Sequence, residues 1–336
     1  MTVALINRRN VILGAAAGAL LGRVPAFAAG DLIPVTLAES QGHGWALFYA
    51  ADAFDLWEKN GLKADISRHT AGRLAMEAVM SSRANFCTAT DSPFVLGNLR
   101  GHRLIAVADF TRSWDLVVTV RTDRGIEGPG DLKGKTIATQ FGTSGHYYLS
   151  RYLTAHGLSL TDIKMMNVGG TDMVNALMRG DIDGFAWNVR SGQVAQNQLP
   201  DMIKMLSNDG VTSAWSNHRL MVTNTETVEN NPEVVHRALR ALFDAETAMK
   251  EQREEIVDYV ADLTKTSKEH TIEDFALSDF TVELGENLID SMVTNAEWAI
   301  DVGISKEPKD DIRTLLREAV RDDFMRAVRP DRVKLA

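Results

Sequence analysis

The sequence has a single cysteine, Cys87, among its 336 residues. One cysteine excludes an internal disulfide, a Cys-x-x-Cys redox pair and a cysteine-based zinc site. Long apolar runs are also missing after the first thirty residues, so no later segment is predicted to anchor the chain in a membrane. The chain has 36 basic and 45 acidic residues and a formal net charge of −9. It therefore lacks the basic excess of a sequence-independent nucleic-acid binder, and no nucleic-acid partner is expected.

Two catalytic motifs are missing as well. The sequence contains no Gly-x-Ser-x-Gly elbow and no His-Glu-x-x-His helix, and its eight histidines are scattered. We therefore expect no catalytic residues, no metal site, no cofactor and no enzymatic activity. A Ser-His-Asp triad stays open, because such residues come together only in space.

What is present has the composition of a globular protein. Apolar residues make up 45% of the chain and charged residues 24%. The length favours two packed units over one, because single hydrophobic cores stop growing at about this size.

The first 28 residues have the pattern of a secretory signal peptide. Arg8 and Arg9 precede an apolar run at 11–22, and an Ala-Phe-Ala cleavage site stands at 26–28. The run is shorter than the roughly 20 residues that cross a bilayer. The paired arginines match a twin-arginine signal in part, so both export routes stay open. We expect cleavage after Ala28 and a mature protein in the periplasm or outside the cell.

Beyond that segment, predicted strands and helices alternate. The apolar residues between 47 and 57 share one helical face, which predicts one helix that Gly61 ends. Further helices are predicted at 74–79, 145–156 and 171–179, and residues 232–326 are expected to be mostly helical. Short crossovers between strands and helices produce parallel strands with helices on their faces. The strands are predicted at 34–38, 63–68, 85–88, 102–108, 116–120, 136–139, 163–168 and 184–187.

An internal similarity connects two parts of the chain. Residues 60–66 resemble residues 156–163, and the pattern of residues 72–92 recurs at 170–191. A chance match of helix-ending glycines is the alternative, but several matches in the same order favour a duplication. Two similar α/β units present loops at the carboxyl ends of their strands, and two facing sets of such loops form a cleft.

Four motifs carry a resemblance to a known family. They are DLKGKTIA at 131–138, GTSGHYYL at 142–149, ALMRGDIDGFAW at 176–187 and TDSP at 90–93. In this combination the mature chain resembles the periplasmic substrate-binding proteins that feed ABC importers. It is similar to their sulfonate/taurine/nitrate-binding group, which is related to the thiamine-pyrimidine-precursor binders.

The resemblance implies an α/β fold with two lobes, the type II periplasmic binding protein fold. Each lobe is expected to hold a mostly parallel sheet flanked by helices, with a helical C-terminal region. Lobe one is expected at 29–122 plus 208–336, and lobe two at 123–207. The implied function is that of a monomeric receptor, which captures a small anionic solute and delivers it to the membrane subunits of an ABC importer.

Two other functions stay open on the same scaffold. One is the binding or synthesis of a pyrimidine precursor, although the related synthases use a cysteine-rich segment and this chain has Cys87 alone. The other is a sensory module that reports solute occupancy to a membrane kinase. For the favoured receptor, the solute is expected to be sulfonate-like or carboxylate-like.

In the first unit, the candidate ligand-binding residues follow the predicted strands. Arg112 is a candidate bidentate clamp for a sulfonate or carboxylate, with a surface arginine as the alternative. Asp91 either caps a helix or holds a ligand amine. The full set is Gln41 and His43 after the first strand, Thr70 and Gly72 after the second, Asp91 and Ser92 after the third, and Arg112 after the fourth.

In the second unit, the candidates lie where strands give way to helices. A helix start leaves amide groups open and favours an anion, although a plain helix cap is the alternative. Trp187 is either an apolar wall or a core residue, and His146 is either a donor or a surface residue. The full set is Gly142, Thr143, Ser144, Gly145 and His146 after one strand, and Trp187, Asn188 and Arg190 after another.

Overall fold

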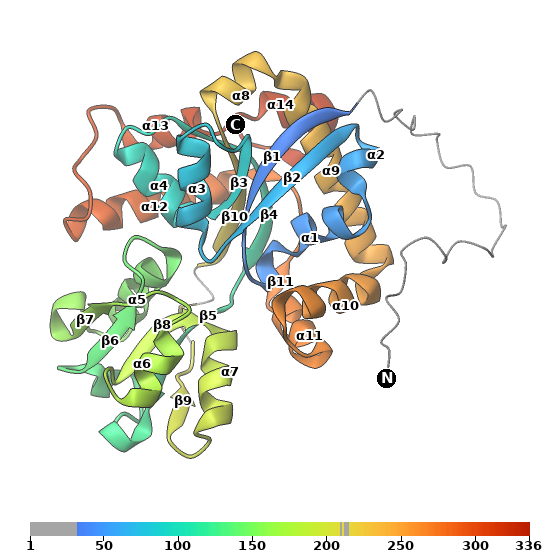
Figure 1. Ribbon diagram of the computed structural model, residues 1–336. Helices are drawn as coiled ribbons and strands as arrows, with labels where there is room; N and C mark the ends of the chain where they lie inside the picture. Colours follow the sequence, from blue (N-terminus) through green and yellow to red (C-terminus); the bar gives the residue numbers. More distant parts are fainter. Residues whose placement is uncertain (1–31, 209, 212–214) are drawn as a thin grey trace, which may run out of the picture.

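The computed structural model describes residues 32–208, 210–211 and 215–336. The signal peptide predicted at 1–28 lies outside the described residues. The described chain forms two lobes, the larger drawn above the smaller in Figure 1. No helix in the described ranges is both long and apolar enough to cross a membrane.

Lobe one takes its elements from both ends of the chain (Figure 1). The N-terminal part contributes β1 (Ile33–Ser40), α1 (Ala46–Ala53), α2 (Leu56–Lys59), β2 (Leu62–His69), α3 (Gly72–Met80), β3 (Phe86–Thr90), α4 (Asp91–Leu99) and β4 (Leu104–Ser113). The C-terminal part contributes β10 (Asn217–Asn224), α8 (Thr225–Asn230), α9 (Pro232–Glu251), α10 (Arg253–Thr264), α11 (Lys268–Ala276), β11 (Ser278–Asp279), β12 (Leu284–Gly285), α12 (Glu286–Asp301), α13 (Ile312–Glu318), α14 (Asp323–Val328) and β13 (Val333–Lys334).

Lobe two is continuous in sequence. Its strands form a five-stranded sheet in the order β7-β6-β8-β5-β9, and its helices pack on the faces of that sheet (Figure 1). The elements are β5 (Leu116–Arg121), β6 (Thr136–Thr139), α5 (Ser144–Ala155), β7 (Lys164–Asn167), α6 (Met173–Arg179), β8 (Gly184–Asn188), α7 (Val189–Gln198) and β9 (Ile203–Met205).

The two sheets have equivalent strand orders. In the six-stranded sheet of lobe one the order is β11-β4-β10-β3-β1-β2, so β2-β1-β3-β10-β4 corresponds to β7-β6-β8-β5-β9 in lobe two. This correspondence pairs β3 with β8 and the start of α4 with the start of α7. The two segments that resemble each other in sequence therefore occupy equivalent places in the two lobes.

Both sheets are mixed: most strands of each sheet run in the same direction, as expected, and a minority run against them. β1 pairs in parallel with β2 and β3, and β6 pairs in parallel with β7 and β8. β10 and β5 are antiparallel to their neighbours. The reason is topological: each of these strands follows a crossing between the lobes, so it runs away from the lobe interface while β1–β3 or β6–β8 run toward it.

Strand pairing also moves one lobe boundary. β5 pairs with β8 and β9, so Leu116–Arg121 belongs to lobe two, whereas the sequence placed everything up to residue 122 in lobe one. The outgoing crossing therefore lies at residues 114–115, between β4 and β5. Apolar strands of this length look alike in sequence whichever sheet they join.

The single helix predicted at 47–57 is two helices in the structure. α1 ends at Ala53, and α2 begins at Leu56 after Asp55, whose φ of 53° is left-handed. Both pieces still bury their apolar side, including Leu47 and Trp57, and Gly61 with φ 77° ends the second piece as predicted. The apolar periodicity continues across the break at Asp55, so the sequence pattern alone did not show that there are two helices.

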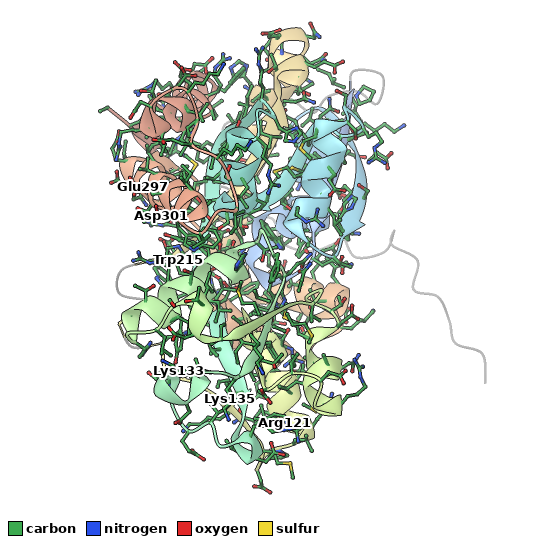
Figure 2. The ribbon with its side chains drawn as sticks, turned by 90° about the vertical axis from the view of Figure 1, so that its left-hand side faces the viewer. Arg121, Lys133, Lys135, Trp215, Glu297 and Asp301 are labelled. Atoms are coloured by element: carbon green, nitrogen blue, oxygen red, sulfur yellow. The ribbon has the colours of Figure 1, made fainter. Side chains whose placement is uncertain are left out.

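An aromatic contact joins the lobes along one side. Tyr147 and Tyr148 of α5 lie 6.0 and 5.8 Å, between ring centroids, from Trp215, which precedes β10. Tyr147 also lies 5.0 Å from Trp298 of α12. Figure 2 shows Trp215 between the upper and lower lobes, below the helix that carries Glu297 and Asp301. This buried cluster sets the spacing of the lobes next to the cleft.

Candidate functional site

A cavity of about 560 Å³ lies between the lobes, within the size range of small-molecule sites. Lobe one lines it with the loop between β1 and α1, the first turn of α3, β10 and the loop between α10 and α11. Lobe two lines it with the first turns of α5 and α7 and with Gly170 and Thr171. We call this space the main cavity.

Ten of the fifteen sequence-predicted site residues line the main cavity. They come from both lobes, so the structure brings together segments up to 149 positions apart along the chain. They are Gln41, His43, Thr70, Gly72, Thr143, Ser144, Gly145, Trp187, Asn188 and Arg190.

Asp91 and Ser92 do not line the main cavity. Both are fully buried, where Asp91 accepts hydrogen bonds from the Ser92 amide and from Ser291 of α12 at 2.9 Å each. Ser92 accepts a hydrogen bond from Asn295 of α12 at 2.6 Å. Burial raises the pKa of the Asp91 carboxyl to about 6. The pair attaches α4 to α12, so the structure does not support contact with a solute.

Arg112 does not line the main cavity either. Its guanidinium lies 2.5 Å from the Asp279 carboxylate of β11 and 3.8 Å from Glu283. Arg112 therefore already has two carboxylate partners within the protein, in place of the bound anion that was predicted. The residue joins β4 to the edge strand β11 instead of facing the cleft.

Gly142 and His146 lie on the far side of the first turn of α5. They line a second cavity, of about 500 Å³, rather than the main one. His146 is 3% exposed, and burial lowers its pKa to about 4, so the ring is neutral at physiological pH. The helix period explains the split, because successive residues are rotated by about 100° around the helix axis, so Ser144 and His146 face different sides of the turn.

The first turn of α5 also connects the lobes. Ser144 Oγ donates a hydrogen bond of 2.7 Å to Thr90 Oγ1 at the end of β3. Thr143, at the helix cap position, donates to the Gln140 carbonyl instead of capping the helix. The first turn of α3, which follows Ala71, has no side-chain cap either. Both helix starts therefore keep backbone amides available to an anion in the main cavity.

Gly145 and Gly170 make room for Trp187. A Cβ atom on Gly145 would come within 2.8 Å of the Trp187 ring, and one on Gly170 within 2.5 Å. Trp187 is half-buried and forms a wall of the main cavity. Gly145 lies at a helix start that was predicted to bind a ligand, and its missing side chain also makes room for this aromatic wall. Asn188 caps α7 by accepting from the Ser191 amide at 2.8 Å.

Sequence reasoning missed Arg219, the charged residue at the floor of the main cavity. Arg219 projects from β10 and is 5% exposed. It makes a 2.7 Å ion pair with Asp115 at the crossing, donates a hydrogen bond to Ser113, and lies over the Trp45 ring at 5.1 Å. Its Nε atom is buried without a hydrogen-bond partner. No local pattern marks it, because its partners lie about 104 positions away in the chain.

Gly44 is the sequence feature that matches Arg219. A Cβ atom on Gly44 would lie 2.2 Å from the guanidinium carbon, which is not a possible contact. The glycine-rich SQGHG loop at 40–44 is therefore shaped to receive this arginine.

His43 belongs to a cluster that closes the lobe-one side of the cavity. Its Nδ1 lies 2.7 Å from the Asp274 carboxylate of α11. Its Nε2 shares a hydrogen bond of 3.1 Å with Thr266, in the loop between α10 and α11. The same loop contributes Lys265, whose φ of 55° is left-handed. The C-terminal helices thereby hold one wall of the main cavity against β1.

The charges around the main cavity are unbalanced. Its lining includes Arg68, Arg73, Arg190, Arg219 and Lys265, with Asp115 and Asp274 as acids. Arg68 pairs with Glu39 and Asp52, Arg73 with Glu77, and Arg219 with Asp115, so Arg190 and Lys265 supply the excess positive charge. Among the described residues, no ion pair is formed by Arg190 or Lys265, and a guanidinium nitrogen of Arg190 is buried without a hydrogen-bond partner. No cluster of three or more histidine, cysteine, aspartate or glutamate side chains in the described chain is arranged to hold a metal ion. The cavity therefore favours an anion.

Two lobes of equivalent topology around a shared cavity define the periplasmic binding protein fold, as the sequence predicted. The chain belongs to the NMT1/THI5-like family, whose family model matches residues 44–256.

The relatives found by sequence are binding proteins. The chain is 26% identical over 247 residues to a binding protein of Brucella abortus, covering 73% of this chain and 76% of the relative. It is also 26% identical over 257 residues to an aliphatic sulfonates-binding protein of Escherichia coli, covering 75% and 79%.

Solved structures agree on the fold. The alkanesulfonate-binding protein SsuA of Xanthomonas axonopodis pv. citri, bound to MOPS, matches with a TM-score of 0.73 at 18% identity, covering 86% of this chain and 98% of that one. The desulfurization enzyme DSZB matches with a TM-score of 0.64 at 13% identity, covering 89% and 99%. The same scaffold thus occurs in a binding protein and in an enzyme.

Proposed function

We propose that the protein is an exported solute receptor, which captures a small organic anion in the main cavity and delivers it to the membrane subunits of an ABC importer. A sulfonate or a carboxylate is the class of solute that the cavity favours. The observation that carries the proposal is the excess of arginine and lysine around a space lined from both lobes. The sulfonate-binding relatives support the same class.

In the proposed mode of binding, the head group of the solute lies between the first turns of α3 and α5. Backbone amides there donate to oxygen atoms, and the partial positive charge of each helix start favours an anion. Arg190 approaches from lobe two and Arg219 from lobe one. Trp187 and Trp45 supply apolar walls for the rest of the solute.

Closure of the lobes completes the site. The hydrogen bond between Ser144 and Thr90 joins the two lobes, and we propose that it forms on closure. The solute favours the closed state because it contacts both walls in that state alone. We propose that the importer recognises this closed form. We also propose that the receptor acts as a monomer in the periplasm after removal of residues 1–28.

Catalysis is the competing function, because an enzyme shares the fold. Cys87, the single cysteine, is 0% exposed in the core of lobe one, and burial raises the pKa of its thiol. It therefore does not reach the main cavity as a nucleophile. A pyrimidine-precursor synthase that depends on several cysteines would lack its reactive groups here.

The test is a titration that uses the two tryptophans of the cavity as a fluorescence signal. MOPS, taurine, methanesulfonate, benzoate, nitrate and a neutral aminopyrimidine are added in turn to the purified protein. We expect at least one sulfonate or carboxylate to bind, and the Arg190→Gln variant to bind it about tenfold less tightly. Binding of the aminopyrimidine alone, or chemical turnover of any bound compound, would contradict the proposal.

A further inference from the structure

The second cavity lies between α3 and α4 of lobe one and the first turn of α5 of lobe two, which all contribute lining residues. Its volume is about 500 Å³, close to that of the main cavity. The first turn of α5 divides the two spaces, with Ser144 on one side and Gly142 and His146 on the other. Among the residues that the structure describes, only Arg73 and Pro93 line both cavities.

The charges on the walls of the second cavity are mainly positive. Arg73 and Arg100 are the cations that line it, and Glu77 is the single acid among its lining residues. Glu77 accepts a hydrogen bond of 2.9 Å from Arg73, so this pair is neutral overall. Arg100 makes no ion pair with any residue that the structure describes. An anion is therefore the complementary occupant at the Arg100 end.

The remaining walls are apolar and in part exposed. Met76, Met80, Leu96, Phe141 and Ile304 line the cavity, and Met80 and Phe141 are 37% and 39% exposed. Large apolar side chains are open to solvent at few other places among the described residues. An occupant with an apolar or aromatic part would cover them and gain about 25 cal/mol for each Å² removed from water.

His146 supplies a donor with no partner. Its ring is stacked on Phe141 at 4.9 Å between centroids and lies nearly perpendicular to the Trp298 ring at 5.1 Å between centroids. Its Nδ1 accepts a hydrogen bond from the Gly142 amide at 3.4 Å, so the proton lies on Nε2. Nε2 is buried and has no hydrogen-bond partner among the described residues. A buried donor without an acceptor is costly, and an oxygen atom of an occupant would satisfy it.

From these observations we propose that the second cavity is a binding site for a small amphipathic anion, an aromatic or short-chain alkyl sulfonate or carboxylate. Its charged group pairs with Arg100, and its apolar part covers Met80 and Phe141. Because both lobes contribute walls, the occupant binds the closed arrangement, and binding in either cavity favours binding in the other. This proposal holds whether or not the main cavity binds the solute that the importer transports.

The test uses naphthalene-1-sulfonate as the probe, titrated into the purified protein by calorimetry. Arg100→Glu should weaken binding about tenfold or more, because it replaces attraction by repulsion. The matched control is Arg103→Glu, which makes the same change of charge three positions away and outside both cavities. The control should bind within about twofold of the unmodified protein.

A second pair of variants tests the apolar wall. Met80→Glu should weaken binding about tenfold, whereas Met166→Glu, at an equally exposed methionine outside both cavities, should not. His146→Phe keeps the stacked ring but removes the donor, and it is matched by His156→Phe at the end of the same helix. We expect His146→Phe to weaken binding of the probe and His156→Phe to leave it unchanged.

Three results would overturn this proposal. The first is no binding of the probe at about 1 mM, the weak limit of a specific site. The second is an equal loss of affinity for the probe in each variant and in its matched control. The third is loss in Arg190→Gln with no loss in Arg100→Glu, which would place the probe in the main cavity and leave the proposed receptor function standing.

Discussion

The two lobes share a strand order but differ in how they hold charge. The sheet of lobe one is surrounded by buried ionisable groups, whereas among the described residues of lobe two Arg121 is the single charged side chain below 10% exposure. The buried set in lobe one is Glu39, Asp91, Asp109, Asp274, Glu246, Glu283, His218 and Arg219. The same topology thus supports two different electrostatic designs.

The difference follows the route of the chain. Lobe one is assembled from two distant parts, and its buried ionic contacts join one part to the other. His218 of β10 lies 2.6 Å from Asp109 of β4, and Arg219 lies 2.7 Å from Asp115. Lobe two is one continuous segment, whose strands follow one another with short connections, and apolar packing is sufficient for it.

This contrast indicates a division of tasks in the cleft. Lobe one presents a fixed cation, Arg219, whose position is set by Ser113, Asp115 and Trp45. Lobe two presents Trp187, helix amides and Arg190, which has no ion pair among the described residues. We infer that the rigid lobe sets where the solute's charge lies and that the second lobe closes over it.

The largest expected effect comes from Arg219. Arg219→Met removes the cation of a buried ion pair, so the Asp115 carboxylate loses its charged partner and keeps only the hydrogen bond from the Ser113 hydroxyl. The free energy of unfolding should fall by about 3–5 kcal/mol. Arg190→Met, the matched change in lobe two, should lower it by less than about 1 kcal/mol. Urea unfolding of both variants measures the difference.

A double variant separates the charge from the packing. Arg219→Met combined with Asp115→Leu removes both charges, so it should recover part of the stability lost in the single variant. If Arg219→Met and Arg190→Met destabilise equally, the contrast between a charged and an uncharged lobe is wrong.

The second effect concerns pH and again lies in lobe one. Glu39 is fully buried, and burial raises the pKa of its carboxyl from 4.5 to about 7, although the Arg68 guanidinium at 3.4 Å opposes this shift. The folded state therefore holds the proton more tightly than the unfolded state. Glu39 favours folding fully below about pH 4.5, and this contribution is lost as the pH rises to about 7.

Glu39→Gln removes that dependence on pH. The variant should gain stability relative to the unmodified protein between pH 5 and pH 8, by up to about 3 kcal/mol. Glu77→Gln, at an exposed carboxylate in a surface ion pair, should show no such trend. Free energies of unfolding measured at four pH values test this expectation. Parallel curves of unfolding free energy against pH for Glu39→Gln and the unmodified protein would contradict it.

The sequence predicted the parts of this design that repeat locally. Alternating strands and helices, the helix-ending Gly61 and the helix start at 143–145 all follow from short patterns, and the structure places them as expected. Ten predicted site residues line the main cavity because each follows a strand that points at the cleft. Whether they contact the solute stays a prediction.

The sequence did not predict what depends on distant partners. Arg112 looked like a ligand clamp because Asp279, its partner, is 167 positions away. Asp91 looked like a cleft residue because its contact with Ser291 spans 200 positions. Arg219 was missed for the same reason. In each case the identity of the partner, and not the residue itself, decides between a structural and a binding role.

The smallest effect concerns the contact between the lobes at the cleft. Ser144→Ala removes the hydrogen bond to Thr90, which contributes about 1 kcal/mol and therefore about a fivefold change in solute affinity. Ser144→Asp should lower the affinity for an anion by about tenfold or more, because it places like charge at the start of α5. The fold should tolerate it, since a carboxylate is favourable at a helix N-terminus.

The two variants together distinguish closure from charge recognition. If the solute is anionic, Ser144→Asp should lose much more affinity than Ser144→Ala, and added salt should narrow the gap between them by screening the repulsion. Equal losses would mean that Ser144 matters only through its contact with Thr90, so that lobe two contributes closure and no anion recognition at this turn. Tighter binding by Ser144→Asp would instead require a cationic solute, and the positive lining of the cleft would then need another explanation.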